Sequence, residues 1–285
     1  METCVVAIKT VLFCFSLPFY IYSIVQINRT EIKYLRSFQQ KKFRKAESKF
    51  LLEGWRPLRD VLESNYIVEL IATLPEISKR PENANVLATA KNRKIPIKEL
   101  KEIQLRQLSD TKNSQGVVAL VHIKKPALDL KFLQSANIIV ACDGISDPGN
   151  LGTIIRTCDW FGVDAVLLNR DCVSLYNEKV IRSTAGSIFH LNVFEDIDFG
   201  DVISELKLNG FKFIVTALDG EPLDSYIPSG RNIIVLGSEA QGVSKNLIRT
   251  ADDVIGIPRY GHAESLNVGI ACGIFLSHWR RHIAK

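Results

Sequence analysis

The chain has 285 residues, of which 46% are hydrophobic and 24% charged, and its net charge is +5. This composition excludes a largely disordered chain and leaves room for two domains of ordinary size. The six cysteines form no CxxC pair and no zinc-like cluster with histidine, so we expect no metal site and favour free thiols in a reducing cytoplasm.

The first predicted segment is strongly apolar. Residues 10–27 carry no charge and contain Pro18. This run is barely long enough to span a bilayer, and it lacks the small-residue cleavage site of a signal peptide. We therefore expect residues 1–28 to be a hydrophobic extension. It is either a start assigned too far upstream, which we favour, or a genuine membrane anchor.

Residues 29–123 are predicted to form a small α/β domain. Periodicity predicts helices over Glu31–Arg44, Trp55–Leu62 and Pro96–Leu108. Apolar runs predict strands over Phe50–Glu53, Ile67–Thr73, Asn85–Ala90 and Val117–His122. Residues 29–60 contain ten Lys or Arg against four Asp or Glu. This excess suits a polyanionic partner, although a solvated helix face explains it about as well.

Residues 124–135, which include Pro126, are predicted to be a linker to a second domain over residues 136–285. The second domain has predicted strands at Ile138–Asp143, Val163–Leu168, Phe213–Ala217, Ile233–Leu236 and Asp253–Ile257. Strands this apolar on both faces predict a parallel sheet with helices on either side. No GxGxxG turn follows an early strand, and no Ser-His-Asp set or phosphate-binding GxxxxGK loop is present.

Three polar, glycine-containing turns each join a predicted strand to a predicted helix. They are Asn150–Thr157, Leu236–Gly242 and Ile257–Val268. The carboxyl ends of parallel strands meet at one edge of a sheet, so the three turns predict a ligand site there. The first turn opens a helix that we expect to run to about Phe161, and the amino terminus of such a helix attracts anions.

Each polar side chain in these turns also has a purely structural interpretation. Arg156 could form a surface salt bridge. Glu239 could interact favourably with the dipole at the amino terminus of the helix that follows it. Asn150 and Ser265 could be helix caps, and Asn267 could be a turn residue. The residues alone leave these alternatives open.

The order and amino-acid sequences of the three turns closely resemble the three motifs of the SpoU (TrmH-type) RNA 2′-O-ribose methyltransferases, which belong to the SPOUT superfamily. The resemblance covers residues 138–285 in detail. Residues 33–53, with the FLLEG phrase at 50–54, and residues 114–119 resemble the ribosomal-protein-like RNA-binding domain often found ahead of such domains. The resemblance implies an α/β protein with a small RNA-binding domain and a carboxyl-terminal parallel-sheet domain that contains a deep trefoil knot.

The resemblance further implies that a methyl group passes from S-adenosylmethionine to a ribose 2′-hydroxyl of RNA, without a metal. It assigns catalytic roles to Arg156, Asn150, Glu239, Ser265 and Asn267. It assigns cofactor binding to Thr216, Ala217, Leu218, Gly237, Ile257 and Leu266. Arg156 falls on the catalytic arginine of the family, where it either acts as base or positions a phosphate and stabilises the alkoxide.

Two positions bear on how the site contacts RNA. Residues 183–187 match a small-residue segment that lies near the RNA-facing side in the family. Arg259 departs from the family pattern, in which methionine is common.

The resemblance also implies a homodimer that shares its active site, and a membrane association only if residues 1–28 are authentic. Ribosomal RNA is the favoured substrate and transfer RNA the second, while the rival hypothesis is a non-catalytic RNA-binding assembly factor.

Overall fold

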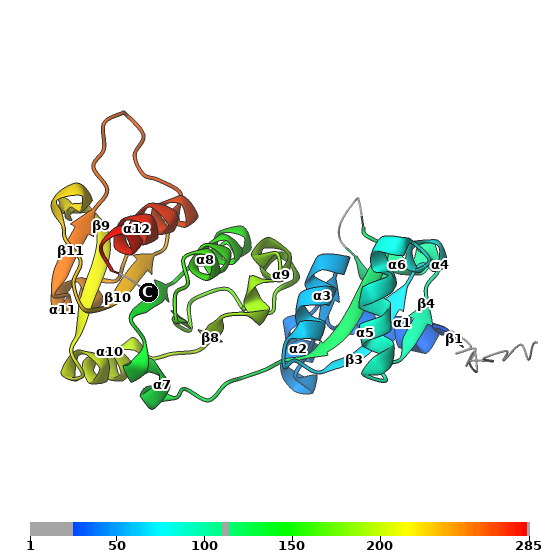
Figure 1. Cartoon of the computed structure of the whole chain (residues 1–285). Helices are drawn as coiled ribbons and strands as arrows, with labels where there is room; N and C mark the ends of the chain where they lie inside the picture. The colour runs from blue at the N-terminus through cyan, green and yellow to red at the C-terminus, as the bar shows by residue number, and fades with distance from the viewer. Residues whose placement is uncertain (1–24, 110–113, 284–285) are drawn as a thin grey trace, which may run out of the picture.

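The computed structural model describes residues 25–109 and 114–283, which fold into two α/β parts joined by a linker (Figure 1). The apolar residues 10–24, and with them the choice between extension and anchor, lie outside the described residues. Within the described ranges, no helix combines the length and the apolar character that crossing a membrane requires.

The amino-terminal part is a small sheet between two layers of helices. Its described strands are β1 (Val25–Gln26), β2 (Lys49–Glu53), β3 (Val68–Thr73), β4 (Ile97–Glu99) and β5 (Val117–His122). Their order is β1-β4-β3-β5-β2, and β5 is antiparallel to both of its neighbours. The helices are α1 (Arg29–Ser37), α2 (Lys41–Glu47), α3 (Trp55–Glu63), α4 (Pro75–Ser78), α5 (Ala84–Asn92) and α6 (Glu102–Leu108), with a 3₁₀ turn η1 (Pro81–Asn83). One face of the sheet packs on α3 and α5, and the other packs on α1 and α6.

The helix predicted over Glu31–Arg44 is wrong in its continuity, because the structure breaks it into α1 and α2. The buried Arg44 side chain folds back onto the break. Its Nη1 donates to the carbonyl of Phe38 at 2.9 Å and to that of Gln39 at 2.8 Å. These bonds satisfy carbonyls that a continuous helix would have used internally, so they stabilise the turn between the two helices.

Two further predictions in this part are wrong. The strand predicted over Asn85–Ala90 is the helix α5, in which Val86 and Ala90 are buried at helical spacing. The helix predicted over Pro96–Leu108 is a short strand followed by a helix. The Pro96 carbonyl accepts the Ile71 N–H at 2.9 Å as the chain enters β4, and α6 starts only at Glu102.

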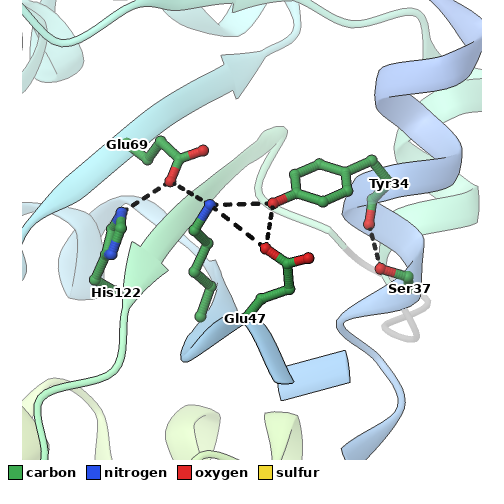
Figure 2. A network of polar contacts seen from close by, with 6 residues as sticks. Tyr34, Ser37, Glu47, Glu69 and His122 are labelled. Atoms are coloured by element: carbon green, nitrogen blue, oxygen red, sulfur yellow. Dashed lines mark hydrogen bonds and ion pairs between the residues drawn. The ribbon is translucent and has the colours of Figure 1, made fainter. Parts of the chain in front are cut away.

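A polar network ties α1 and α2 to one end of the small sheet (Figure 2). Lys49 Nζ lies 2.7 Å from Glu69 Oε2 and donates to the Tyr34 hydroxyl at 3.1 Å. His122 Nε2 lies 2.8 Å from the same Glu69 oxygen, and the Tyr34 hydroxyl donates to Glu47 at 3.3 Å. Burial disfavours the charged form of Lys49, but the bonds to Glu69 and Tyr34 outweigh it and raise its pKa. The network therefore holds α1 and α2 on strands β2, β3 and β5.

The carboxyl-terminal part contains a sheet whose described strands are all parallel, as predicted. They are β6 (Ile138–Asp143), β7 (Ala165–Leu168), β8 (Asn192–Phe194), β9 (Phe211–Pro222), β10 (Arg231–Gly237) and β11 (Asp253–Gly256), in the order β11-β9-β10-β6-β7-β8. The helices are α7 (Leu130–Ser135), α8 (Pro148–Trp160), α9 (Glu178–Thr184), α10 (Phe199–Leu208), α11 (Lys245–Thr250) and α12 (Val268–His282), with 3₁₀ turns η2 (Ser187–Phe189) and η3 (Leu223–Ser225). The edge strand β8 was not predicted, because three residues give too short a pattern.

The helices form one layer on each face of this sheet. Helices α8, α9 and α12 cover one face, and α7, α10 and α11 cover the other. Two glycines bring the first layer close together. A Cβ on Gly152 would lie 2.3 Å from the Cβ of Ser183 on α9, and one on Gly269 would lie 2.8 Å from Thr153 Cγ2. These contacts fix α8 between its two neighbours.

Buried thiols lie where the sheet meets this helix layer. Cys142 on β6, Cys158 on α8 and Cys272 on α12 are free and buried. Burial raises the pKa of Cys142 and Cys158 well above the usual range. Cys172 is also free, and burial raises its pKa to about 11. Cys142, Cys158 and Cys172 are therefore uncharged at neutral pH. Buried free thiols pack as small hydrophobic side chains.

The two parts of the chain share an aromatic junction. The rings of Phe50 and Tyr176 lie 4.9 Å apart, and those of Tyr66 and Phe189 lie 5.1 Å apart. The Tyr176 hydroxyl donates to the carbonyl of Lys124 at 2.7 Å and lies 3.3 Å from the Tyr66 hydroxyl. Buried side chains of both parts belong to one continuous apolar cluster. The linker therefore joins two parts that pack directly on each other.

Replacing Tyr176 with alanine is expected to lower the free energy of unfolding by about 3 kcal/mol, because a buried ring is lost from the junction. Tyr176→Phe keeps the ring and loses only the hydroxyl bonds, so we expect a loss of about 1 kcal/mol. Urea denaturation of the three proteins measures both values. Equal stability of the alanine variant and the native protein would contradict the packing described above.

Candidate active site

The three predicted turns lie at one edge of the large sheet, although the first, residues 150–157, is part of α8 rather than a turn. Strands β6 and β10 are parallel neighbours, and Asp143 at the end of β6 is paired with Gly237 at the end of β10. Strand β9 lies on the other side of β10, and β11 follows β9. The chain leaves this edge through the turns into α8, α11 and α12. The fold thus gathers the three turns as the sequence predicts.

Three polar side chains, one from each turn, form a hydrogen-bonded cluster. Asn150 Nδ2 donates to Glu239 Oε1, and Asn267 Nδ2 donates to Asn150 Oδ1 at 2.8 Å. Asn267 Oδ1 in turn accepts the N–H of Gly269 at 3.0 Å, so Asn267 also caps α12. Both polar ends of the Asn150 amide are engaged, and this fixes its orientation. We call these three residues the Asn150 cluster.

The cap of α8 is Asp147 rather than Asn150. Asp147 Oδ1 accepts the Asn150 N–H at 2.9 Å, and Lys179 Nζ lies 3.5 Å from its second oxygen. The bond from the Asn150 N–H is the main reason that the pKa of Asp147 is lowered, and Lys179 adds to it. The capping interpretation of Asn150 is therefore wrong. Its side chain is left to join Glu239 and Asn267.

The structure does not bring Arg156 and Ser265 into this cluster. Arg156 is exposed on α8, and no ion pair among the described residues includes it. It lies six residues beyond Asn150, which is about 9 Å along a helix axis. The Ser265 hydroxyl is exposed and makes no hydrogen bond to another described residue. Both side chains are free to contact something outside this copy of the chain.

The predicted cofactor residues lie at the same edge. Thr216, Ala217 and Leu218 are in β9, Gly237 ends β10, and Ile257 directly follows β11. Leu266 stands just before α12. The Thr216 hydroxyl donates to the carbonyl of Val235 at 2.8 Å, which ties β9 to β10. Gly237, Ile257 and Leu266 thus fall at a strand end or in the turns that follow, while Thr216–Leu218 lie within β9, directly after Val215, which pairs with Val235 near the end of β10.

Close backbone contacts shape this edge. A Cβ on Gly237 would lie 2.2 Å from both Gly242 C and Val243 N, since the second turn folds back onto its own strand. The N–H of Gly242 donates to the carbonyl of Ser238 at 2.9 Å and closes that turn. A Cβ on Gly256 would lie 2.8 Å from the Ala217 carbonyl. Glycine is therefore required where strands and turns approach most closely.

Two residues that connect this edge were missed by the sequence analysis. Asp143 accepts from Asn169 Nδ2 at 2.7 Å and from the Ser244 N–H at 2.8 Å. Asn169 Oδ1 accepts the Gly144 N–H at 3.0 Å. These bonds link the ends of β6 and β7 to the start of α11, just after the second turn. The available signal was a carboxylate or amide directly after an apolar strand.

In residues 25–109 and 114–283, no three His, Cys, Asp or Glu side chains are grouped so that they could hold a metal ion. The Asn150 cluster contains two amides and one carboxylate, and it is organised by hydrogen bonds instead.

Known proteins match both parts of the chain. Residues 137–277 match the SpoU rRNA Methylase family, and residues 29–119 match the MRM3-like substrate binding domain. The chain is 33% identical over 251 residues to the 23S rRNA (guanosine(2553)-2′-O)-methyltransferase RlmP of Bacillus subtilis, which covers 88% of this chain and 96% of the relative.

Two solved structures share the whole arrangement. An AdoMet-bound rRNA methyltransferase from Sinorhizobium meliloti is 27% identical with a TM-score of 0.80, over 92% of this chain and 98% of that one. An RNA 2′-O ribose methyltransferase is 26% identical with a TM-score of 0.79, over 91% and 98% of the two chains. The predicted α/β class, with a small amino-terminal domain ahead of a parallel-sheet domain, is confirmed. The chain belongs to the SpoU rRNA methylase family, as its three turns predict.

Proposed function

We propose that this protein transfers a methyl group from S-adenosylmethionine to a ribose 2′-hydroxyl of ribosomal RNA. The predicted enzyme class and cofactor are confirmed by the family to which the chain belongs. The observation that carries the proposal is the Asn150 cluster, which joins all three motifs at one edge of the sheet. The choice of ribosomal RNA is supported by the Bacillus subtilis relative, whose name specifies 23S rRNA.

The edge of the large sheet at which β6, β10 and β11 end fits the cofactor. Leu218 is 72% exposed and Leu266 is 45% exposed, so two apolar side chains are available to the flat face of an adenine. We assign adenosine binding to the main chain and side chains of Thr216, Ala217, Leu218, Gly237, Ile257 and Leu266. S-adenosylmethionine, when bound, supplies an electrophilic methyl group. The chain contributes alignment of the ribose hydroxyl with that group, which provides most of the catalysis in such transfers.

The catalytic roles follow from what each side chain can reach. The Asn150 cluster has a fixed geometry, so Asn150, Glu239 and Asn267 orient the turns around the reacting hydroxyl. Arg156 positions a phosphate through its planar guanidinium and stabilises the alkoxide as the proton leaves. We prefer this to a base role, because a free guanidinium stays protonated up to a pH of about 12 and so cannot accept the proton. We assign Ser265 to the same site, because its side chain is exposed in the third turn.

We propose that the working form is a homodimer with a shared site. Arg156 makes no hydrogen bond with the Asn150 cluster of its own chain, so we infer that a second copy brings the two together. Apolar side chains are exposed on the same two helices, namely Trp160 at the end of α8 and Ile270 and Ile274 on α12. Such a surface is costly to leave in water and suits a subunit interface.

We assign residues 29–123 to RNA binding, 124–135 to the linker and 136–285 to the catalytic domain, and we expect the carboxyl-terminal chain to be threaded as a trefoil knot. We place the protein in the cytoplasm, because neighbouring buried thiols such as Cys158 and Cys272 are unbridged.

Transfer of labelled methyl from S-adenosylmethionine to unmodified ribosomal RNA tests the function. A 2′-O-methyl group blocks alkaline cleavage of the adjoining phosphodiester, so label is expected in alkali-resistant dinucleotides. Unmodified transfer RNA is run in parallel. Label in transfer RNA alone would show that transfer RNA, rather than ribosomal RNA, is the substrate. Binding of RNA without any methyl transfer would favour a non-catalytic assembly factor.

A further inference from the structure

A cavity lies where α2, the start of the linker and the turn after β7 meet. Five cationic side chains line it: Lys41, Arg44, Lys45, Lys125 and Arg170. The first three come from the small part of the chain and Arg170 comes from the large part. The cavity offers about 40 Å³ to the centres of water-sized molecules. One water needs roughly 10–15 Å³ on this scale, so a single phosphate group fits and a whole nucleotide does not.

The cavity carries an excess of positive charge. Two acidic residues, Glu195 and Asp196, face the five cations. Burial raises the pKa of Glu195, and its Oε1 already accepts the Leu175 N–H at 2.8 Å. The lining residues are therefore not neutralised by one another, and an anion would be attracted to this cavity.

Arg44 is the buried part of the lining. Only 5% of its surface is exposed, and its Nε has no hydrogen-bond partner among the described residues. Burial lowers the pKa of Arg44, and the charges of Glu178 and Glu195 oppose that change. A buried N–H without a partner is destabilising, and an anion seated beside it relieves that cost.

The cavity and the Asn150 cluster lie along the same edge of the large sheet. Asn169 lines the cavity, and its amide donates to Asp143, which also accepts the N–H of Ser244, the cap residue of α11 just after the second turn. Strand β7 is followed in the sheet by β6 and then by β10. Neighbouring strands are about 4.8 Å apart, so the end of β7 lies roughly 10 Å from that of β10. A stretch of about two nucleotides of one RNA strand can span this distance.

We infer that the cavity binds one backbone phosphate of the substrate RNA, close to the nucleotide that is methylated. The inference rests on the proposed function, since it assumes an RNA substrate at the Asn150 cluster. Both parts of the chain contact the same phosphate, so the contact sets the position of the RNA strand across the junction. Phosphate contacts carry position rather than sequence, so the identity of the neighbouring base is not read here.

The test uses the double variant Lys45→Gln with Arg170→Gln, which removes one cation from each part. Both side chains are exposed, so their loss leaves the fold intact. Arg44 is kept, because it holds the turn between α1 and α2. The matched control is Lys91→Gln with Arg281→Gln, which removes the same total charge from exposed positions that do not line the cavity.

RNA affinity is measured for the full-length proteins over a range of salt concentrations. The cavity variant is expected to bind RNA about tenfold more weakly, and the control less than about twofold. The slope of log affinity against log salt should fall in magnitude by about 0.7 for each lost phosphate contact with a single strand. The KM for RNA should rise in the cavity variant while kcat and the affinity for S-adenosylmethionine stay near the native values.

Equal weakening in the two double variants would overturn the inference, because the effect would then come from net charge alone. Thermal stabilisation by inorganic phosphate that only the cavity variant loses, with RNA binding unchanged, would assign the cavity to a free anion and also overturn it. If the native protein transfers no methyl group but RNA binding still separates the two variants, the proposed function fails and the phosphate contact stands.

Discussion

Replacing Arg156 with alanine is expected to reduce methyl transfer by two to three orders of magnitude or more, about the loss seen when one charge-stabilising donor is removed from a transition state. The affinity for S-adenosylmethionine should remain within about twofold, because Arg156 is exposed and belongs to none of the strand ends assigned to the cofactor. Single-turnover methylation and equilibrium binding of the cofactor measure the two effects separately. Arg281→Ala, another exposed arginine on the same domain, is the control and should be near normal.

Two further variants define the role of Arg156. Lysine at this position keeps the charge but loses the planar fork, so Arg156→Lys should recover only part of the activity if the residue positions a phosphate. Mixing Arg156→Ala with Asn150→Ala subunits should restore roughly a quarter of native activity in a shared-site dimer, since half of the dimers are mixed and each has one complete site. Near-native turnover by Arg156→Ala would contradict the assignment, and a mixture without activity would contradict the shared site.

Gly237→Ala is expected to weaken S-adenosylmethionine binding by about 10- to 100-fold. The new Cβ would lie 2.2 Å from Gly242 C and Val243 N, so the second turn must move away from its strand. Overpacking of this kind costs typically 1–3 kcal/mol, and that energy converts to the stated range of affinity. Calorimetric titration with the cofactor measures the change, and methyl transfer should fall in parallel.

Gly261→Ala is the matched control for this prediction. It also adds one methyl group to a loop glycine near the site, but no atom outside its immediate chain neighbours lies within 4 Å of the added Cβ. It should bind the cofactor normally. Circular dichroism distinguishes a displaced turn from an unfolded domain in the Gly237 variant. Native cofactor affinity in that variant, with the fold retained, would remove Gly237 from the cofactor site.

The large sheet could be predicted from the sequence because its strands are continuous apolar runs separated by strong turn signals. The small part was predicted less well, because its segments are short and several turns depend on distant partners. The helix at Asn85–Ala90 shows the difficulty, since six residues with two buried positions fit either period. The break between α1 and α2 depends on Arg44 reaching back to Phe38 and Gln39, a contact that no local pattern displays.

The candidate site was predictable only as a set of turns. Sequence order shows that Asn150, Glu239 and Asn267 each follow a strand, and the parallel topology then brings them together. It does not show which side chains bond to each other. Asp143 and Asn169 were missed for the same reason, because their contact depends on β6 and β7 being neighbours in the sheet.

The labelling rate of the buried thiols reports how often helices α8 and α12 separate from the large sheet. Cys142, Cys158 and Cys272 belong to β6, α8 and α12, and each is closed to solvent while these elements are packed together. A thiol reagent can modify them only after strand and helices separate, so their labelling rate follows that separation rather than the chemistry of the thiol. Slower labelling in the presence of S-adenosylmethionine or RNA would therefore report how strongly each ligand holds the two helices on the sheet.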